Sequence, residues 1–151
     1  MGEEKKHRFE DLTRTIIGCA FNVSNDLGCG FLEKVYENSL AVEFRQKNIP
    51  FGAQVPLRVL YSGQTVGEYV ADMIVDSSVL VEIKATEIDN PAHKAQVINY
   101  LRATGLEVGL LLNFGRPRLS VQRLVRSHNY FIKTGVPLEH TGHALDVEGE
   151  L

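Results

Sequence analysis

The sequence is poor in cysteine, and this excludes some kinds of site. Only Cys19 and Cys29 occur among 151 residues, and they are not spaced as C-x-x-C. Such usage fits a reducing cytosol and excludes a four-cysteine iron–sulfur cluster within one chain. We expect two free thiols, with Cys19 buried as a small apolar side chain, although sequence alone also permits a disulfide.

The sequence also lacks long apolar runs and several familiar motifs. No apolar run approaches ~18 residues, and the charged N-terminus MGEEKKHRFE has no apolar signal segment, so we expect no membrane span, no secretion and a cytoplasmic location. There is no phosphate-binding glycine-rich loop, and no serine or cysteine nucleophile motif stands out. His140 and His143 form H-x-x-H, but two histidines in an expected tail make a poor zinc site.

Acidic residues are absent from one long stretch of an otherwise mildly acidic chain. The formal net charge is −3, yet residues 108–138 contain no Asp or Glu. The basic residues of this stretch are Arg116, Arg118, Arg123, Arg126 and Lys133. A locally basic face is compatible with phosphate contacts, and an ordinary solvated arginine surface explains it equally well.

What is present fits one globular domain. The apolar content is 44% and the charged content 23%, which is ordinary for a soluble domain with a sizeable core. We expect residues 1–135 to form a single domain. Residues 136–151 have no apolar period, and we expect them to form a flexible acidic tail.

Hydrophobic periodicity predicts the order helix, helix, three strands, helix, strand, strand. The expected helices span residues 8–27, 31–47 and 91–104, the last capped by Asn90 and ended by Gly105. The expected strands span residues 54–61, 66–75, 79–85 and 108–114. Residues 118–126 alternate and favour a strand over a helix, and residues 129–134 are candidates for a short further element.

Three charged residues interrupt the apolar runs at residues 69–75 and 79–85. They are Asp72, Glu82 and Lys84. Glu82 and Lys84 share one strand face, roughly 6–7 Å apart. Buried charges are costly unless they are paired or bind a metal. An edge strand with a solvated face explains Glu82 and Lys84 alone, whereas the addition of Asp72 on the preceding strand favours a site for a hard divalent cation.

The length of the turn decides whether the two carboxylates can cooperate. A two-residue turn at Ser77 and Ser78 would place Asp72 opposite Ile83 and turn Glu82 to the other face. A three-residue turn, Asp76 to Ser78, would place Asp72 opposite Glu82. A shared site therefore predicts the odd-length turn, or a bulge with the same effect.

These residues resemble the core motif of the PD-(D/E)xK nuclease superfamily. Asp72 stands for its aspartate, with Ala71 in place of the proline, and Glu82-Ile83-Lys84 stands for E-x-K. A second run, Gly30 to Glu37, reads G-x-x-E-x-x-Y-E and resembles the signature of the GxxExxY proteins, a branch of that superfamily. The resemblance covers residues 8–126 and implies an α/β restriction-endonuclease-like core, with a mixed sheet flanked by helices.

The resemblance also implies roles for individual residues. Glu33, Asp72 and Glu82, with the backbone carbonyl of Ile83, are expected to hold Mg²⁺, or Mn²⁺ in its place, and Lys84 completes the catalytic set. Gln96 and Tyr100 form the Q-x-x-x-Y pattern found beside the site in exonuclease-like members. Tyr36 and Glu37 complete the expected substrate contacts.

The function expected from these motifs is metal-dependent hydrolysis of phosphodiester bonds in nucleic acid, with DNA favoured. The alternative from another class is a non-catalytic nucleic-acid-binding or protein-binding module that kept the fold. A third reading is a structural domain whose charges form an internal salt-bridge network. A small domain leaves little room for specificity elements, so a second copy or a partner protein is a further expected partner.

Overall fold

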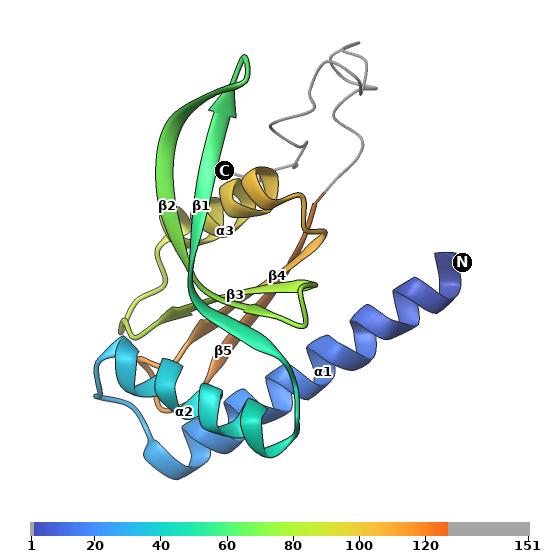
Figure 1. Cartoon of the computed structure of the whole chain (residues 1–151). Coiled ribbons are helices and arrows are strands. Elements are labelled where there is room, and N and C mark those ends of the chain that lie inside the picture. Colours follow the sequence, from blue (N-terminus) through green and yellow to red (C-terminus); the bar gives the residue numbers. More distant parts are fainter. Residues whose placement is uncertain (1, 127–151) are drawn as a thin grey trace.

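A computed structural model describes residues 2–126 as one five-stranded sheet flanked by three helices (Figure 1). In chain order the elements are α1 (Gly2–Leu27), α2 (Glu33–Gln46), β1 (Phe51–Tyr61), β2 (Gln64–Val75), β3 (Val79–Lys84), α3 (Pro91–Thr104), β4 (Val108–Asn113) and β5 (Ser120–Val125). The predicted α/β class, the element order and the restriction-endonuclease-like arrangement are all confirmed.

The sheet is mixed, with the strands in the order β1-β2-β3-β4-β5. β3 and β4 are parallel, and the other neighbouring pairs are antiparallel. The parallel pair is joined through α3, as a crossover connection requires. Residues 108–113 are all buried, which explains why β4 reads as a continuous apolar run. Residues 120–125 form a strand, as the alternation of apolar and polar residues predicted.

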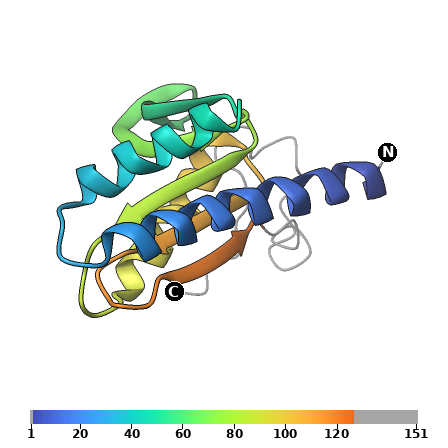
Figure 2. The same ribbon diagram turned by 90° about the horizontal axis from the view of Figure 1, so that it is seen from below.

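Two apolar clusters cover opposite faces of the sheet. On one face, α1 and α2 pack on side chains such as Met73, Val81 and Leu110. On the other face, α3 packs on Leu80 and Leu111. Figure 2 shows α1 and α2 running across the same side of the sheet. Leu80 and Val81 belong to different clusters, as the alternation of a buried strand requires.

The hairpin of β1 and β2 extends well beyond the strand that follows it. β1 pairs with β2 from Phe51 to Tyr61, whereas β3 pairs with β2 only over Met73–Val75. We call the free part of the hairpin, residues 55–71, the arm. Leu57 and Ala71 of the arm belong to the α3-side cluster, and Figure 1 shows the arm running alongside α3.

The predicted helix ends of α3 are confirmed. The Asn90 side chain accepts a hydrogen bond from the amide of Ala92, Pro91 is the first helical residue, and Gly105 ends the helix at a φ of 74°. α1 begins at Gly2, earlier than predicted, because its charged first turns carry no apolar period. Contacts from Lys5 to Glu107 and from Arg8 to Asp76 hold that extension.

Further expectations concern the two cysteines, membrane spans and the C-terminal residues. Cys19 is buried and Cys29 exposed, and both thiols are free, as expected. No helix within residues 2–126 is long and apolar enough to cross a membrane. The expected element at residues 129–134, the tail at residues 136–151 and the H-x-x-H histidines lie outside the described residues.

Candidate active site

Asp72 and Glu82 lie opposite each other where β2 and β3 separate. The turn between these strands has three residues, because Val75 pairs with Val79, as the shared-site interpretation predicted. The ladder continues through Ile74 and Met73 and stops there. In the same register, the next opposed pair is Asp72 and Glu82. The odd-length turn therefore places the two carboxylates on one face of the sheet.

At Asp72 and Glu82, hydrogen bonds from backbone amides to side-chain carboxylates take the place of the backbone-to-backbone bonds of the strand ladder. The amide of Asp72 donates to Glu82 Oε1 at 2.9 Å, and the amide of Ile83 donates to Asp72 Oδ2 at 2.8 Å. Each carboxylate thus accepts from the opposite strand's backbone. These bonds fix both side chains where β2 separates from β3. The other oxygen of each carboxylate takes no part in these two bonds.

Glu82 is held in an environment that disfavours its charge. Only 3% of the residue is exposed. Burial, and next the negative charge of Asp72, raise the pKa of Glu82 to about 8. The positive charge of Lys84 acts in the opposite direction and lowers the pKa of Glu82, but its effect is the smallest of those that act on this group. A buried carboxylate that lies beside a second, partly buried carboxylate is suited to a cation.

Lys84 is connected to α3 through two predicted site residues. Its Nζ donates to Gln96 Oε1 at 3.0 Å, and Gln96 Nε2 donates to the Tyr100 hydroxyl at 3.2 Å. The i to i+4 spacing on α3 stacks Gln96 and Tyr100 on one side of the helix. Burial first, and then the charge of Glu82, raise the pKa of Tyr100. Hydrogen bonds join Lys84, Gln96 and Tyr100, and the charges of Asp72 and Lys84 act on Glu82, so the structure brings these five predicted residues together.

Glu37 is the carboxylate of α2 that Gln54 links to Asp72. Only 5% of Glu37 is exposed. Gln54 Nε2 donates to both Glu37 oxygens, at 3.1 and 3.0 Å, and lies 3.5 Å from Asp72 Oδ1. Lys34 Nζ also reaches Glu37 Oε1 at 3.3 Å. Glu37 was expected to contact substrate. Its carboxylate is instead enclosed and tied to Asp72 through Gln54.

Gln54 was missed in the sequence, although it lies directly across from Asp72. Its neighbours Ala53 and Val55 pair with Met73 and Ala71, while Gln54 itself adopts a φ of 52°. Left-handed backbone is uncommon for a residue with a side chain and marks a local distortion of the strand. A polar residue in an alternating strand was the only available signal, and the left-handed conformation is not visible in sequence.

Glu33 occupies a different place from the one expected. It is exposed and begins α2, where a carboxylate suits the helix dipole. No group of three or more His, Cys, Asp or Glu side chains at metal-binding spacing occurs among residues 2–126. The expected grouping of Glu33 with Asp72 and Glu82 is therefore not formed. The charge of Glu33 acts on His93, whose pKa is lowered first by burial and then by Lys84.

Tyr36 was expected to contact substrate, and the structure corrects this. The residue is fully buried and stacks on Phe114 with ring centroids 4.5 Å apart. Its hydroxyl donates to the carbonyl of Gly28 at 2.7 Å and accepts from the amide of Phe31 at 3.3 Å. Tyr36 therefore anchors the loop that precedes α2. The sequence pattern around Tyr36 could not distinguish a buried anchor from a residue of the site.

A second network, also missed, holds the segment that follows Lys84. Asn113 Oδ1 accepts from the amide of Thr86, and Asn113 Nδ2 donates to the carbonyl of Thr86 and to Asp89 Oδ1. Asp89 also accepts from Arg116 at 2.6 Å. The hydrogen bond from Asn113 is the main cause that lowers the pKa of Asp89. Anchoring this segment restrains the end of β3, where Lys84 lies.

The donor set fits a magnesium ion. Mg²⁺ in proteins usually keeps several waters and binds one or two carboxylates together with substrate phosphates. Asp72 and Glu82 provide two hard oxygen donors, and the high pKa of Glu82 means that a cation would relieve an unfavourable charge. The amide of Ile83 already contacts Asp72, and its carbonyl as a further ligand stays a prediction.

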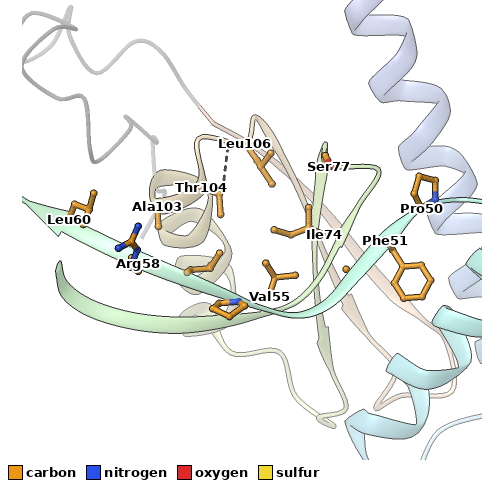
Figure 3. Close-up of a pocket in the computed structure, with 13 residues that line it drawn as sticks. Pro50, Phe51, Val55, Arg58, Leu60, Ile74, Ser77, Ala103, Thr104 and Leu106 are labelled. Atoms are coloured by element: carbon orange, nitrogen blue, oxygen red, sulfur yellow. Dashed lines mark hydrogen bonds between the residues drawn. The ribbon is translucent and has the colours of Figure 1, made fainter. Parts of the chain in front are cut away.

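A large hollow in the described part of the molecule does not coincide with this site. It measures about 730 Å³ and lies between β1 and the C-terminal end of α3 (Figure 3). Apolar side chains such as Val55, Leu60, Ile74 and Leu106 line it beside polar groups that include Arg58. None of the predicted site residues lines it. The chemistry of the carboxylates, rather than the size of a hollow, identifies the candidate site.

Comparisons with known proteins agree with this geometry. A model of the family described as the PD-(D/E)XK nuclease superfamily matches residues 10–124. No curated protein matches the sequence. Among solved structures, the crystal structure of SSO0001 is similar, with a TM-score of 0.51 and 20% sequence identity over 62% of this chain and 50% of that chain. The match thus spans half the length of SSO0001, and it concerns the fold alone.

Proposed function

The chain belongs to the PD-(D/E)XK nuclease superfamily, and from this premise we propose that it is a metal-dependent nuclease acting on nucleic acid, with DNA favoured. We also propose that it represents the GxxExxY branch, because Gly30 to Glu37 carries the G-x-x-E-x-x-Y-E pattern. The observation that carries the proposal is the carboxylate pair of Asp72 and Glu82 on one sheet face, with Lys84 adjoining it.

The proposed metal-holding groups are Asp72, Glu82 and the carbonyl of Ile83. A bound Mg²⁺ or Mn²⁺ would supply Lewis-acid polarisation of the scissile phosphate and lower the pKa of a coordinated water. The protein's contribution is to hold the carboxylates rigidly. The crossed hydrogen bonds between β2 and β3 do this, since each carboxylate is fixed by the opposite strand's amide.

Lys84, Gln96 and Tyr100 have separate proposed roles. Lys84 places a positive charge beside the carboxylates, where it would orient the attacking water or stabilise charge on the phosphate oxygens. Gln96 accepts from Lys84 and so fixes the direction of its ammonium group. Tyr100 supports Gln96 through its hydroxyl. A shift of Lys84 would be costly, because such electrostatic stabilisation depends on preorganised geometry.

The resemblance predicted Glu33 as the carboxylate that α2 brings to the site. We propose that Glu37 has this role instead. Gln54 joins Glu37 to Asp72, whereas Glu33 is exposed at the start of α2. Matched Glu37→Gln and Glu33→Gln variants test the choice. We expect the first to lower metal-dependent cleavage at least about tenfold and the second to have little effect. If Glu33→Gln lowered cleavage and Glu37→Gln had little effect, Glu33 would be the carboxylate of the site.

The function itself is tested by a nuclease assay with Mg²⁺ or Mn²⁺ on single- and double-stranded DNA and RNA. We expect metal-dependent cleavage that Asp72→Ala and Glu82→Ala abolish. The free thiols Cys19 and Cys29 support a cytoplasmic location for this activity. Cleavage of none of these substrates, together with no stabilisation by metal, would overturn the proposal.

A non-catalytic binding module is the second candidate. One observation favours it: the described residues contain no three-membered cluster of metal-binding side chains. Such a module would bind nucleic acid or a protein without metal-dependent cleavage. A structural salt-bridge network is disfavoured, because the pKa of Glu82 is raised, whereas a tight ion pair with Lys84 would lower it.

A further inference from the structure

A hollow of about 520 Å³ adjoins the candidate active site, between α3 and the arm. Gln96 and Tyr100 line it, and these are the residues that connect with Lys84. Tyr69 of β2 and Asn99 and Arg102 of α3 also line it. Its volume is within the range of small-ligand sites, and the shared residues place it directly beside the carboxylate pair. We call it the α3–arm pocket.

One wall of the α3–arm pocket is aromatic. Tyr69 and Tyr100 lie with ring centroids 5.8 Å apart and ring planes inclined by 51°. Tyr100 is buried, whereas Tyr69 is 51% exposed. The Tyr69 ring therefore has surface available to a planar ligand. Stacking on such a ring is worth about 1–3 kcal/mol per nucleobase and tolerates any base.

The pocket also offers polar groups on α3. Asn99 is exposed and carries an amide that can both donate and accept. Arg102 also lines the pocket and carries guanidinium N–H donors. Aromatic rings beside amide and guanidinium groups match a nucleotide, whose base can stack and whose ring edge and phosphate carry acceptors, better than they match an aliphatic side chain.

We propose that the α3–arm pocket binds an unpaired nucleotide of the substrate. This inference rests on the proposed nuclease function and names its substrate class: single-stranded nucleic acid, or an unpaired end or flap next to a duplex. In a duplex, both faces of each base are covered by neighbouring bases and its pairing edge is occupied. Only an unstacked base has a face for Tyr69 and an edge for Asn99.

The test measures binding and cleavage separately. Fluorescein-labelled oligodeoxythymidylate and oligouridylate serve as single-stranded probes, and the same oligodeoxythymidylate annealed to oligodeoxyadenylate serves as the duplex. Binding is measured by fluorescence anisotropy in EDTA, where metal-dependent cleavage does not occur. We expect tighter binding of a single-stranded probe than of the duplex, and we expect Tyr69→Leu to weaken it about tenfold or more.

Two control variants separate stacking from other effects. Tyr69→Phe keeps the ring and is expected to bind as the unmodified protein does. Tyr61→Leu is the same substitution at a tyrosine of the same hairpin that is 74% exposed and does not line the pocket, so it is expected to change nothing. Thermal unfolding of each variant checks that the fold is retained. Asn99→Leu, on an exposed face of α3, is expected to weaken binding without loss of stability.

The outcomes distinguish this inference from the proposed function. Metal-dependent cleavage that is equal in Tyr69→Leu and Tyr61→Leu, with equal binding, would overturn the pocket assignment and leave the nuclease intact. Binding that depends on Tyr69, without cleavage of any nucleic acid, would support the pocket and overturn the nuclease. Failure to bind either single-stranded probe, or duplex binding of equal strength with the same dependence on Tyr69, would overturn the pocket assignment.

Discussion

Glu82 is the residue whose charge is most sensitive to the surrounding structure. Its pKa is raised by burial and by Asp72 from an ordinary 4.5 to about 8. In the metal-free protein, the folded state therefore retains a proton that the unfolded chain releases between those values. A divalent cation would replace the proton, which couples metal affinity to pH.

This gives a prediction about stability. Because the folded pKa is above the unfolded one, the stability contribution is fully present below pH 4.5 and is lost as pH rises through about 8. In EDTA we expect the free energy of unfolding to fall by roughly a few kcal/mol over that range. Glu82→Gln keeps an acceptor for the amide of Asp72 and removes the titration, so its pH profile is expected to be flatter.

Urea unfolding of both proteins across this pH range measures the effect. Contributions from other titrating groups cancel in the difference between the two profiles. Parallel profiles would show that Glu82 titrates normally and that the site is more hydrated than its burial indicates.

Lys84 gives the second prediction at this scale. In Lys84→Ala, we expect cleavage to fall about 10²–10³-fold, because one preorganised electrostatic stabiliser is lost. Stabilisation of the fold by Mg²⁺ is expected to persist or increase, since a positive charge near the ligands is removed. Single-turnover cleavage and thermal unfolding with and without Mg²⁺ measure the two effects.

Two further variants serve as controls for Lys84. Lys6→Ala changes an exposed lysine of α1 and is expected to alter neither effect, whereas Glu82→Ala is expected to remove both. If Lys84→Ala cleaved normally, then Lys84 would have a structural role through Gln96 alone.

At the scale of elements, the segment leading into α2 shows how the G-x-x-E-x-x-Y-E run is used. Gly30 adopts a φ of 109°, a conformation that favours glycine. Tyr36 bonds to the backbone at Gly28 and Phe31 and so closes this loop over the start of the helix. The start of α2 is thereby set, and Glu37 is directed toward Gln54. The motif thus combines a loop anchor, Tyr36, with a buried carboxylate, Glu37.

The third prediction tests the anchoring role of Tyr36. Tyr36→Phe keeps the ring stacked on Phe114 and removes both hydroxyl contacts, which leaves two backbone groups without their partner. We expect a loss of about 1–3 kcal/mol in the free energy of unfolding, measured in urea. Affinity for nucleic acid in EDTA is expected to be unchanged. Weakened binding with unchanged stability would instead support the substrate contact that the sequence suggested.

At the scale of the whole molecule, charge is distributed unevenly along the chain. The net charge is −3, and residues 139–151 contain four acidic residues, Glu139, Asp146, Glu148 and Glu150, and no Lys or Arg. Without these four, the formal charge is +1. The acidic residues therefore oppose the approach of a polyanion to the domain, in a manner that depends on ionic strength.

The fourth prediction concerns truncation after Gly135. The sequence beyond it has no periodic apolar face, so we expect the melting temperature to remain nearly unchanged. Binding to nucleic acid is expected to strengthen at low salt, because negative charge is removed. Differential scanning fluorimetry and anisotropy titrations at two salt concentrations test both parts. A drop of several degrees in melting temperature would show that these residues stabilise the domain.

The element order and the carboxylate register could be predicted because they depend on neighbours along the chain. Asn90, Pro91 and Gly105 mark the ends of α3 through local backbone chemistry. The odd number of residues in the β2–β3 turn places Asp72 across from Glu82, since strand side chains alternate with a period of two. The spacing of Gln96 and Tyr100 likewise follows from the helical repeat.

Tertiary packing decided which side chains join the carboxylate pair. Glu33 and Glu37 are one turn apart on α2 and appear equivalent in sequence, but the way α2 packs on the sheet buries Glu37 and leaves Glu33 exposed. Gln54 lies opposite Asp72 at a left-handed residue of β1, and its amide reaches both Glu37 and Asp72. The ring of Tyr69 meets Tyr100 because the arm lies along α3. These contacts join residues distant in sequence, so no local period encodes them.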